Sequence, residues 1–476
     1  DFKKMGFSLD LSRQFTTGDA EYNKFIEWQF YNYKNKNLLK QAAYPILYCT
    51  NDKNAVGEDD IKDGDTNPVE VQKFTGVKSE LLEEKAFLVS ATLRPDTVWG
   101  ITNIFINPNE EYVKARVEYN GRQENWIVSE KSLEKLRLQG KKIEIVKKIN
   151  GGELVGKYCT TPLGTRIPIL PGTFVDASHA TGFVISVPAH APYDYVALQE
   201  LRTDKKTTPL VKKLVEEIQL IPLINTPGFG EYPAKEISEK MKIANTREKA
   251  KLEKANQELY KSEFYGGTLN EKCGRFAGQQ VSDAKPKIAD WLVAENKAVW
   301  VYENSRKGVI CRCGGEVVVA ELNDQWFLDF NAPNWKKKSF ECLEKISVNP
   351  TQYKKQFHDV FEWLDKRPCA RRRGLGTQLP FANEWIIESL SDSTIYMAFY
   401  TVIKQVREHK IKPTQLTKEF FDYVLLGAGE VKQASKKTGV PSVALESIRT
   451  EFIYWYPNDL RHTGTAHITN HLSFFI

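Results

Sequence analysis

Cysteine is scarce in this sequence, with seven residues scattered over 476 positions. A disulfide-stabilised secreted domain needs cysteines at closer spacing, so the scarcity predicts a reducing, cytoplasmic setting. Long apolar runs are missing as well, since none approaches the ~20 residues of a membrane-spanning helix. Residues 1–6 carry no apolar stretch of a secretory signal. The sequence therefore predicts neither membrane insertion nor secretion.

What is present is the balance of a globular protein, with 41% hydrophobic and 27% charged residues. The length suits two to four domains. A net charge of +6 permits contact with a polyanion without requiring it. The sequence begins without Met and stops in an apolar run at 472–476. We therefore expect an internal piece of a longer polypeptide.

Local patterns predict several elements. A helical pattern follows Asp19, whose side chain would accept amide hydrogens of the first turn. Turn formers crowd residues 44–78, which indicates a connection between domains. A polar stretch at 246–265 predicts a surface helix whose charges need no functional explanation, and residues 385–406 mostly have helical spacing. Short apolar runs predict strands at 86–89, 143–146, 167–170, 183–187 and 317–320.

Residues 91–100 bring hydroxyls, a guanidinium and a carboxylate together just after a predicted strand. The hydroxyls of Thr92 and Thr97 can hold a water or a carbonyl oxygen, and Arg94 can hold a phosphate or the terminus of a nucleic acid. The alternative is a polar turn, a common feature, in which Thr97 and Asp96 bond local backbone groups.

A second cluster follows the predicted strand that ends near Ser186. Two prolines stiffen the exit, and His190 and Asp194 follow closely. An Asp held this rigidly is suited to binding an ammonium group through a charge-assisted hydrogen bond. Alternatively, Asp194 caps a helix that starts at Tyr195, and both roles can hold at once.

Three further clusters carry weaker signals. Cys311 and Cys313 resemble half of a zinc knuckle, but structural zinc usually needs two such pairs, so no bound metal is predicted. Arginines at 367 and 371–373 precede a glycine turn and fit either phosphates or a solvated corner. Residues 462–471 hold three of the seven histidines, which favours a small-molecule site over zinc. No Walker-type or Gly-x-Gly-x-x-Gly loop is present.

Six segments together resemble leucyl-tRNA synthetase of the archaeal and eukaryotic cytosolic type. They occur in order and with plausible spacing at 91–100, 181–194, 324–327, 374–380, 390–400 and 454–472. Valyl- and isoleucyl-tRNA synthetases share the general plan, but the 186–194 run is similar to the leucyl version.

The resemblance implies an α/β fold with a doubly wound, Rossmann-like class I synthetase catalytic domain, incomplete here and interrupted by a mixed α/β editing domain. It implies a remnant of the first catalytic half at 1–45, a connector at 46–68, the editing domain (connective polypeptide 1) at 69–285, a return connector at 286–319 and a truncated second catalytic half at 320–476.

The resemblance also implies the functional residues. In the family, editing removes wrong amino acids from the tRNA by ester hydrolysis. Asp194 would grip the α-ammonium, Thr92 and Thr97 would line the pocket and reject leucine, and Arg94 would steady the motif or the terminal adenosine of the tRNA. The remaining assignments are His190, Thr181 and Gly182 for substrate binding in the editing site, Asp392 and Tyr396 for a leucine site, and Gly464, Asn470 and His471 for the adenylate.

The sequence departs from the family at several points. The two ATP signatures, His-x-Gly-His and Lys-Met-Ser-Lys-Ser, are missing from the 476 residues, and truncation explains both losses. Ala466 stands where the family has an acidic residue that binds ribose, Leu11 where a tryptophan is usual, and Ala180 where a glycine precedes Thr181. The editing motifs are therefore more intact than the synthetic ones.

We therefore expect part of a leucine–tRNA ligase, whose parent uses ATP and Mg²⁺ to join leucine to its tRNA. A leucine pocket cannot strongly reject an aliphatic near-isostere, because one methyl group is worth only ~1–3 kcal/mol, so an editing site is needed. This chain alone should not form leucyl-adenylate but should act on tRNA mischarged with isoleucine or norvaline. Two alternatives remain: a subunit of a split synthetase with a complementary chain, and a non-catalytic paralogue that binds tRNA or leucine.

Overall fold

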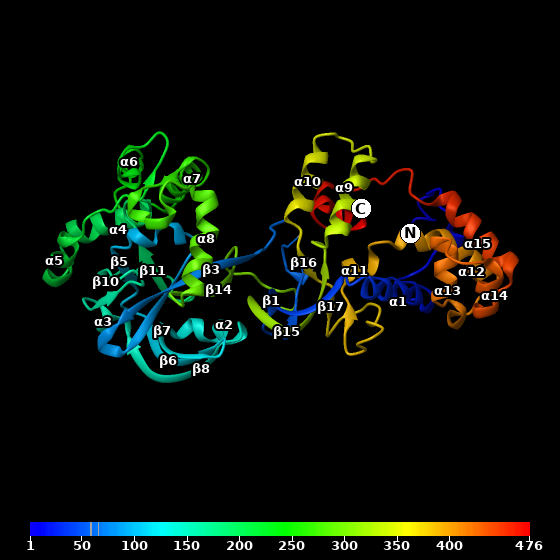
Figure 1. Ribbon diagram of the computed structural model, residues 1–476, viewed down its shortest axis with the longest axis horizontal. Coiled ribbons are helices and arrows are strands. Elements are labelled where there is room, and N and C mark those ends of the chain that lie inside the picture. The colour runs from blue at the N-terminus through cyan, green and yellow to red at the C-terminus, as the bar shows by residue number, and fades with distance from the viewer. Residues whose placement is uncertain (58–59, 65) are drawn as a thin grey trace. The chain divides into compact units, whose positions relative to one another are not determined.

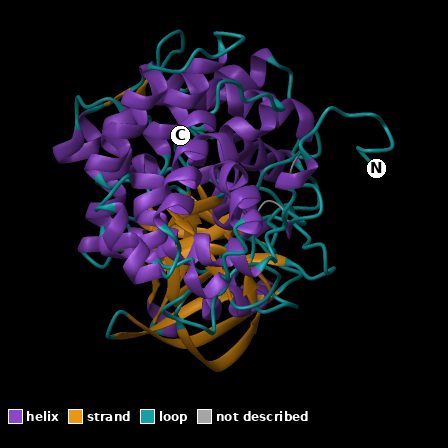
Figure 2. Ribbon diagram, turned by 90° about the vertical axis from the view of Figure 1, so that its right-hand side faces the viewer, coloured by secondary structure: helices purple, strands orange, loops and turns teal. Residues whose placement is uncertain are grey.

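The computed structural model describes residues 1–57, 60–64 and 66–476, and it contains both helices and strands (Figure 1, Figure 2). The chain forms two compact units, which we call unit 1 and unit 2. Unit 1 comprises Asp1–Tyr44, Cys49–Asn67 and Leu322–Ile476, and unit 2 comprises Pro45–Tyr48 and Pro68–Glu321. In sequence, unit 2 is an insertion into unit 1.

A large mixed sheet forms the centre of unit 2, with strand order β11-β5-β10-β9-β3-β4-β7-β6-β8 and β14 paired to β3. Pairs β5–β10 and β4–β7 are parallel, and the others for which a register is defined are antiparallel. Strand β6 shows why these segments are strands: Val113, Ala115 and Val117 alternate with more exposed residues, so one face packs in the core. The strands are β3 (Val71–Leu81), β4 (Ala86–Thr92), β5 (Asn103–Ile106), β6 (Glu111–Tyr119), β7 (Arg122–Ser129), β8 (Lys142–Asn150), β9 (Tyr158–Thr160), β10 (Arg166–Pro171), β11 (Phe183–Ser186) and β14 (Ala298–Asn304).

Helices cover this sheet, and α4, α6 and α7 lie on the same side of it in Figure 1. Helix α7 places Leu252, Ala255 and Leu259 on one buried stripe, which packs with Tyr195 and Val196 of α4. The helices of unit 2 are α2 (Leu133–Leu138), α3 (Gly151–Leu154), α4 (Pro192–Thr203), α5 (Pro209–Glu217), α6 (Pro233–Lys240), α7 (Lys249–Gly266) and α8 (Val281–Ala294), and a short ribbon joins β12 (Ile224–Asn225) to β13 (Thr268–Leu269).

Unit 1 is mainly helical and has an aromatic core. Phe25 of α1 contacts the rings of Phe399 in α12 and Phe421 in α13. A small sheet of order β16-β15-β1-β2 and the pair β17–β18 complete the unit. Its elements are α1 (Ala20–Asn35), β1 (Leu39–Cys49), β2 (Asn54–Ala55), β15 (Val317–Asp329), α9 (Pro333–Glu344), α10 (Tyr353–Trp363), β16 (Lys366–Pro368), β17 (Ala370–Arg371), β18 (Ile386–Ile387), α11 (Ser389–Ser393), α12 (Tyr396–Glu408), α13 (Lys418–Phe421), α14 (Val431–Thr438), α15 (Ser442–Trp455) and α16 (Ser473–Phe475).

All five predicted strands are confirmed, as β4, β8, β10, β11 and β15, and the predicted surface helix is α7. The helical prediction for 385–406 is only partly right, because Ile386–Ile387 first pairs with Ala370–Arg371 as a strand. The capping prediction for Asp19 is wrong. Asp19 precedes α1, but its carboxylate accepts hydrogen bonds from Thr16 and Arg407 instead of the first helical turn.

The boundaries of unit 2 differ from the segment 69–285 expected for an editing domain. Strand β14 lies beyond residue 285, yet its seven residues pair with β3 from Val71 to Val77. The compact unit therefore continues to Glu321. Residues 58, 59 and 65 of the expected connector 46–68 lie outside the described residues. Among the helices that the structure describes, none combines the length and hydropathy needed to cross a membrane.

Candidate functional site

A pocket in unit 2 opens where β4 ends and the chain enters the 3₁₀-helix η4 (Pro95–Gly100). It contains five residues predicted for an editing site. The lining residues are Val77, Thr92, Arg94, Thr97, Val98, Ile101, Ile185, Val187, His190, Ala191, Asp194 and Tyr260. Two segments almost 100 residues apart in sequence thus meet around one cavity.

The threonine motif, residues 92–97, is held by bonds between its side chains and its own backbone. The Arg94 amide donates to Thr92 Oγ1 at 2.9 Å, and the Thr97 hydroxyl donates to the Arg94 carbonyl at 2.9 Å. The polar turn that the sequence offered as an alternative is therefore present in part, because Thr97 bonds the local backbone whereas Asp96 bonds the Arg94 side chain. It is also compatible with a functional role, because both threonines line the pocket.

Internal partners surround the Arg94 guanidinium. It donates to Asp96 Oδ2 at 2.7 Å and to Glu263 Oε2 at 2.5 Å, and it lies 4.7 Å from the centre of the Tyr260 ring. Both carboxylates are fully buried. Since two anions already pair with this one cation, the geometry favours a role for Arg94 in steadying the motif over a role in binding phosphate.

His190 is completely buried and bonded at both ring nitrogens. Its Nε2 accepts from the Leu223 amide at 2.8 Å, so Nδ1 carries the proton and donates to Glu263 Oε1 at 2.7 Å. A general base needs a nitrogen that can reach the reacting water. The hydrogen bonds of His190 therefore suit a fixed part of the pocket wall.

Asp194 lies in the first turn of α4, and Ala191 is the N-cap residue. Its Oδ2 accepts from the Val187 amide at 2.8 Å, so the prediction that Asp194 caps the helix is wrong. The side chain is 5% exposed, and burial raises its pKa to about 7 although the Val187 bond opposes this. A buried carboxylate with so little compensation strongly favours a cation that enters the pocket.

Thr181 and Gly182 lie away from this pocket, immediately before β11. The Gly182 carbonyl accepts from the Tyr112 hydroxyl at 3.0 Å, and a Cβ at Gly182 would come within 2.4 Å of Ser129 Cβ. Ala180 has φ of 50°, a left-handed conformation in which the family's glycine would be less strained. Neither Thr181 nor Gly182 lines the pocket, so the geometry gives no support to their predicted substrate contact.

Residues predicted for a leucine and adenylate site come partly together in unit 1. The His471 ring accepts from Arg461 at Nδ1 and bonds the Ser393 carbonyl through Nε2, and its centre lies 6.1 Å from that of Tyr396. Asp392 is buried, and burial raises the pKa of its carboxyl to about 6. Asn470 bonds the amide of the next residue, while Gly464 is exposed before a short 3₁₀ turn.

The predicted adenylate residues do not fit a magnesium ion. Mg²⁺ prefers carboxylate and phosphate oxygens, whereas Gly464, Asn470 and His471 supply no carboxylate. Residue 466 is an alanine, which supplies no oxygen ligand from its side chain. We therefore derive no step through ATP or Mg²⁺ from this part of the chain.

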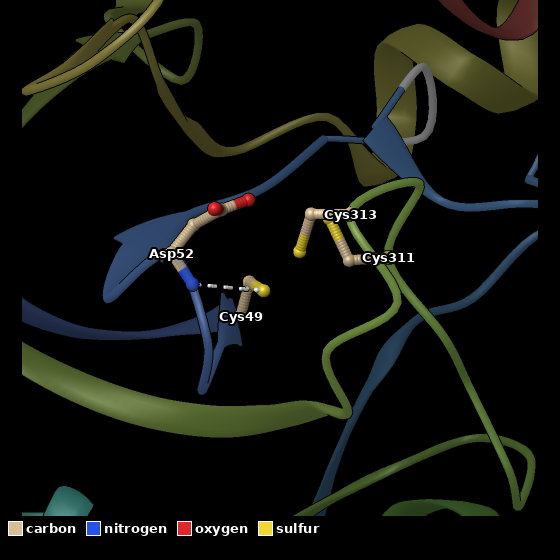
Figure 3. Close-up of side chains that lie close together, drawn as sticks. All are labelled: Cys49, Asp52, Cys311 and Cys313. Carbon is tan, nitrogen blue, oxygen red and sulfur yellow. Dashed lines mark hydrogen bonds between the residues drawn. The ribbon is translucent and has the colours of Figure 1, made fainter.

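Two pairs of side chains with metal-binding chemistry are drawn in Figure 3. In unit 2, Cys311 and Cys313 lie in the turn closed by the bridge between Ile310 and Glu316, and Cys313 Sγ accepts from the Gly315 amide. In unit 1, Cys49 ends β1 and its Sγ accepts from the Asp52 amide at 3.4 Å. The pairs belong to different units, and the expectation of no bound metal stays a prediction.

Sequence reasoning missed two residues of the site, Glu263 and Tyr260, both on α7. From the sequence alone, no function is assigned to the charges of this helix. One signal was available: Glu263 continues the buried stripe of Leu252, Ala255 and Leu259 at helical spacing. An acidic residue on an apolar stripe requires a buried partner, and Arg94 is that partner.

Comparisons with known proteins show the family of this chain. Residues 1–441 match the family model described as tRNA synthetases class I (I, L, M and V). The whole chain is 46% identical to leucine–tRNA ligase of Staphylothermus marinus and 45% identical to that of Methanocaldococcus jannaschii, covering 49% and 50% of those proteins. The chain thus spans about half the length of the curated relatives it matches.

Two solved structures each match about half of this chain. The crystal structure of GlLeuRS-CP1 has 25% sequence identity and a TM-score of 0.44, and the match covers 48% of this chain and 99% of that one. The Plasmodium knowlesi cytosolic leucyl-tRNA synthetase editing domain has 23% identity and a TM-score of 0.45, with 49% and 97% covered.

Proposed function

Because this chain belongs to the class I tRNA synthetases (I, L, M and V), we propose that it is part of a leucine–tRNA ligase and that unit 2 hydrolyses mischarged aminoacyl-tRNA. The substrate would be leucine tRNA carrying isoleucine or norvaline. Water would attack the ester carbonyl, and the bond to the terminal ribose oxygen would break.

The main support for this proposal is the environment of Asp194. Its buried carboxylate has one neutral donor, and it shares the pocket with Arg94, whose charge is already matched by two acids. The α-ammonium of an aminoacyl ester supplies the missing positive charge. A free carboxylate on the same amino acid would be repelled, so the charge pattern suits an ester better than a free amino acid.

The remaining pocket residues suit hydrolysis without a covalent intermediate. An ester is already activated, so a positioned water and well-placed donors are sufficient. Thr92 and Thr97 supply hydroxyls and bulk at the wall, where leucine would be rejected. Because the Arg94 backbone bonds both threonines, a small shift of Arg94 would move the whole wall.

For the parent protein, we propose ligation of leucine to its tRNA with ATP and Mg²⁺. The relatives that carry the name leucine–tRNA ligase are about twice as long as this chain. A subunit of a split synthetase or a non-catalytic tRNA-binding paralogue remains the alternative. A cytoplasmic location stays a prediction from the low cysteine content.

The test is release of the amino acid from purified isoleucyl-, norvalyl- and leucyl-tRNA for leucine. We expect release of the first two, with leucyl-tRNA spared. Asp194→Asn retains the size and the acceptor for Val187 but removes the charge, so kcat/KM should fall about 10- to 100-fold. Unchanged hydrolysis by the folded variant would contradict the role of Asp194, and no release by the wild-type chain would favour the paralogue.

A further inference from the structure

Glu263 of α7 joins three segments around the pocket. Its Oε2 accepts from Arg94 Nη1 at 2.5 Å, and its Oε1 accepts from His190 Nδ1 at 2.7 Å and from the Thr226 hydroxyl at 3.4 Å. The Glu263 side chain is completely buried. Among the hydrogen bonds that the structure describes, those of Glu263 reach three segments: the threonine motif at Arg94, the segment before α4 at His190, and the segment after β12 at Thr226.

Glu263 makes more contacts than an ion pair with Arg94 requires. Arg94 already pairs with Asp96, and this pair alone would balance the charge. Glu263 is a second carboxylate on the same guanidinium, and its other oxygen bonds His190 and Thr226. A role in fixing the geometry of these segments accounts for the contacts that an ion pair with Arg94 alone does not need.

Asp96 and Glu263 hold Arg94 in different ways. Asp96 lies two residues from Arg94 within the same turn, so it moves with the threonine motif. Glu263 comes from α7, 169 positions away in sequence, and is therefore an external anchor. The Arg94 backbone bonds Thr92 and Thr97, the two threonines that line the pocket and that we call the threonine wall. By holding the Arg94 side chain, Glu263 therefore fixes the position of this wall.

The other oxygen of Glu263 bonds a second segment of the pocket, at His190. His190 lies four residues before Asp194, and its ring is clamped between Glu263 and the Leu223 amide. This clamp fixes the segment that leads from β11 into α4. The Glu263 carboxylate therefore fixes the position of the threonine wall and also of the segment that leads to Asp194, the residue proposed to bind the ammonium group.

We propose that Glu263 is a positioning residue that sets the spacing between the threonine wall and Asp194, and thereby the size of the amino acid that is hydrolysed. The proposal rests on the function proposed above. Glu263 has no place in the pocket lining, so it acts through Arg94 and His190. Its loss should change selectivity and kcat more than KM.

The informative substitution is Glu263→Gln. A glutamine has one acceptor oxygen and one NH₂ group, so it can accept from Arg94 or from His190 but not from both. The His190 ring cannot compensate by changing tautomer, because Nε2 already accepts from Leu223. The matched control is Glu258→Gln on the same helix, where the exposed side chain pairs only with Lys240 at 3.7 Å.

We would measure kcat and KM for norvalyl- and leucyl-tRNA with both variants. The expected result for Glu263→Gln is about a tenfold fall in the norvalyl-to-leucyl ratio of kcat/KM, with KM changing less than threefold. Glu258→Gln should match the wild type. A smaller amount of folded enzyme would lower the rates for norvalyl- and leucyl-tRNA by the same factor and leave their ratio unchanged. An unchanged ratio in Glu263→Gln would therefore overturn the proposal.

Hydrogen exchange of the full chain, measured by mass spectrometry, tests the same link without any activity. In Glu263→Gln, exchange should rise at least fivefold in peptides covering 92–100 and 187–194, with β6 and β7 unchanged. Equal exchange in Glu263→Gln and Glu258→Gln would overturn the proposal. A wild-type chain that fails to release any amino acid would reject the proposed function, while the exchange result would still decide the role of Glu263.

Discussion

At the residue scale, Asp194 should make the fold sensitive to pH. An unfolded Asp has a pKa near 3.9, whereas burial raises the pKa of Asp194 to about 7. Between these values the folded state binds more protons than the unfolded state. The free energy of unfolding therefore falls as the pH rises from about 4 to about 7, by at most on the order of 4 kcal/mol.

Asp194→Asn removes this titration, so the variant should be more stable than the wild type at pH 8 by about 2–4 kcal/mol and equally stable at pH 4. Urea unfolding at both pH values measures the difference. Asp204→Asn, at the exposed end of the same helix, is the control and should change stability little at either pH. If the wild type is as stable as Asp194→Asn at pH 8, other groups in the folded protein offset the cost of burying the charged carboxylate, and the prediction is wrong.

Substitutions of Thr97 can separate the effect of its side-chain volume on selectivity from the effect of its hydrogen bond. Thr97→Ser retains the hydroxyl that bonds the Arg94 carbonyl but removes a methyl group from the lining. Since a methyl group is worth about 1–3 kcal/mol of discrimination, hydrolysis of leucyl-tRNA should rise about tenfold or more. Thr97→Val retains the bulk and loses the bond, so it should spare leucyl-tRNA. Rates of amino acid release measure both, and equal selectivity of the two variants would argue against a steric role.

At the element scale, the sequence predicted strands and motifs well and long-range partners poorly. Runs such as 86–89 and 183–187 carry their own pattern, so β4 and β11 were found. The threonine motif and Asp194 were recognisable because each lies in a short, distinctive segment. Glu263 was missed because its importance depends on Arg94, which a helical pattern on α7 does not reveal.

Unit 2 extends past residue 285, the expected end of the editing domain, for a similar reason. Strand β14 has no local feature that ties it to β3, yet Val299 and Val301 pack in the core beside Phe74 of that strand. A fragment comprising 69–285 should therefore fail to fold, because it would expose the pairing edge of β3 and remove part of the core. A fragment comprising 68–321 should fold cooperatively. Circular dichroism with thermal unfolding distinguishes them, and a cooperative transition of the shorter fragment would contradict this argument.

At the scale of the whole molecule, each of the two units holds a buried aspartate whose pKa is raised by burial. Asp194 lines the pocket of unit 2, and Asp392 is one of the two residues predicted for leucine binding in unit 1. The units have separate cores, so their chemistry should be separable as well. The two aspartates therefore provide matched substitutions that assign an activity to a unit.

We expect Asp194→Asn to reduce release of norvaline from its tRNA ester by about 10- to 100-fold, because the charged partner of the ammonium is lost. Asp392→Asn should release norvaline at the wild-type rate, since it changes a carboxylate of equal burial in the other unit. ATP–pyrophosphate exchange with leucine should be undetectable in the wild type and both variants, because both ATP signatures are missing from the sequence. A loss of norvaline release in a folded Asp392→Asn variant would mean that hydrolysis needs unit 1 and that the activity cannot be assigned to unit 2 alone.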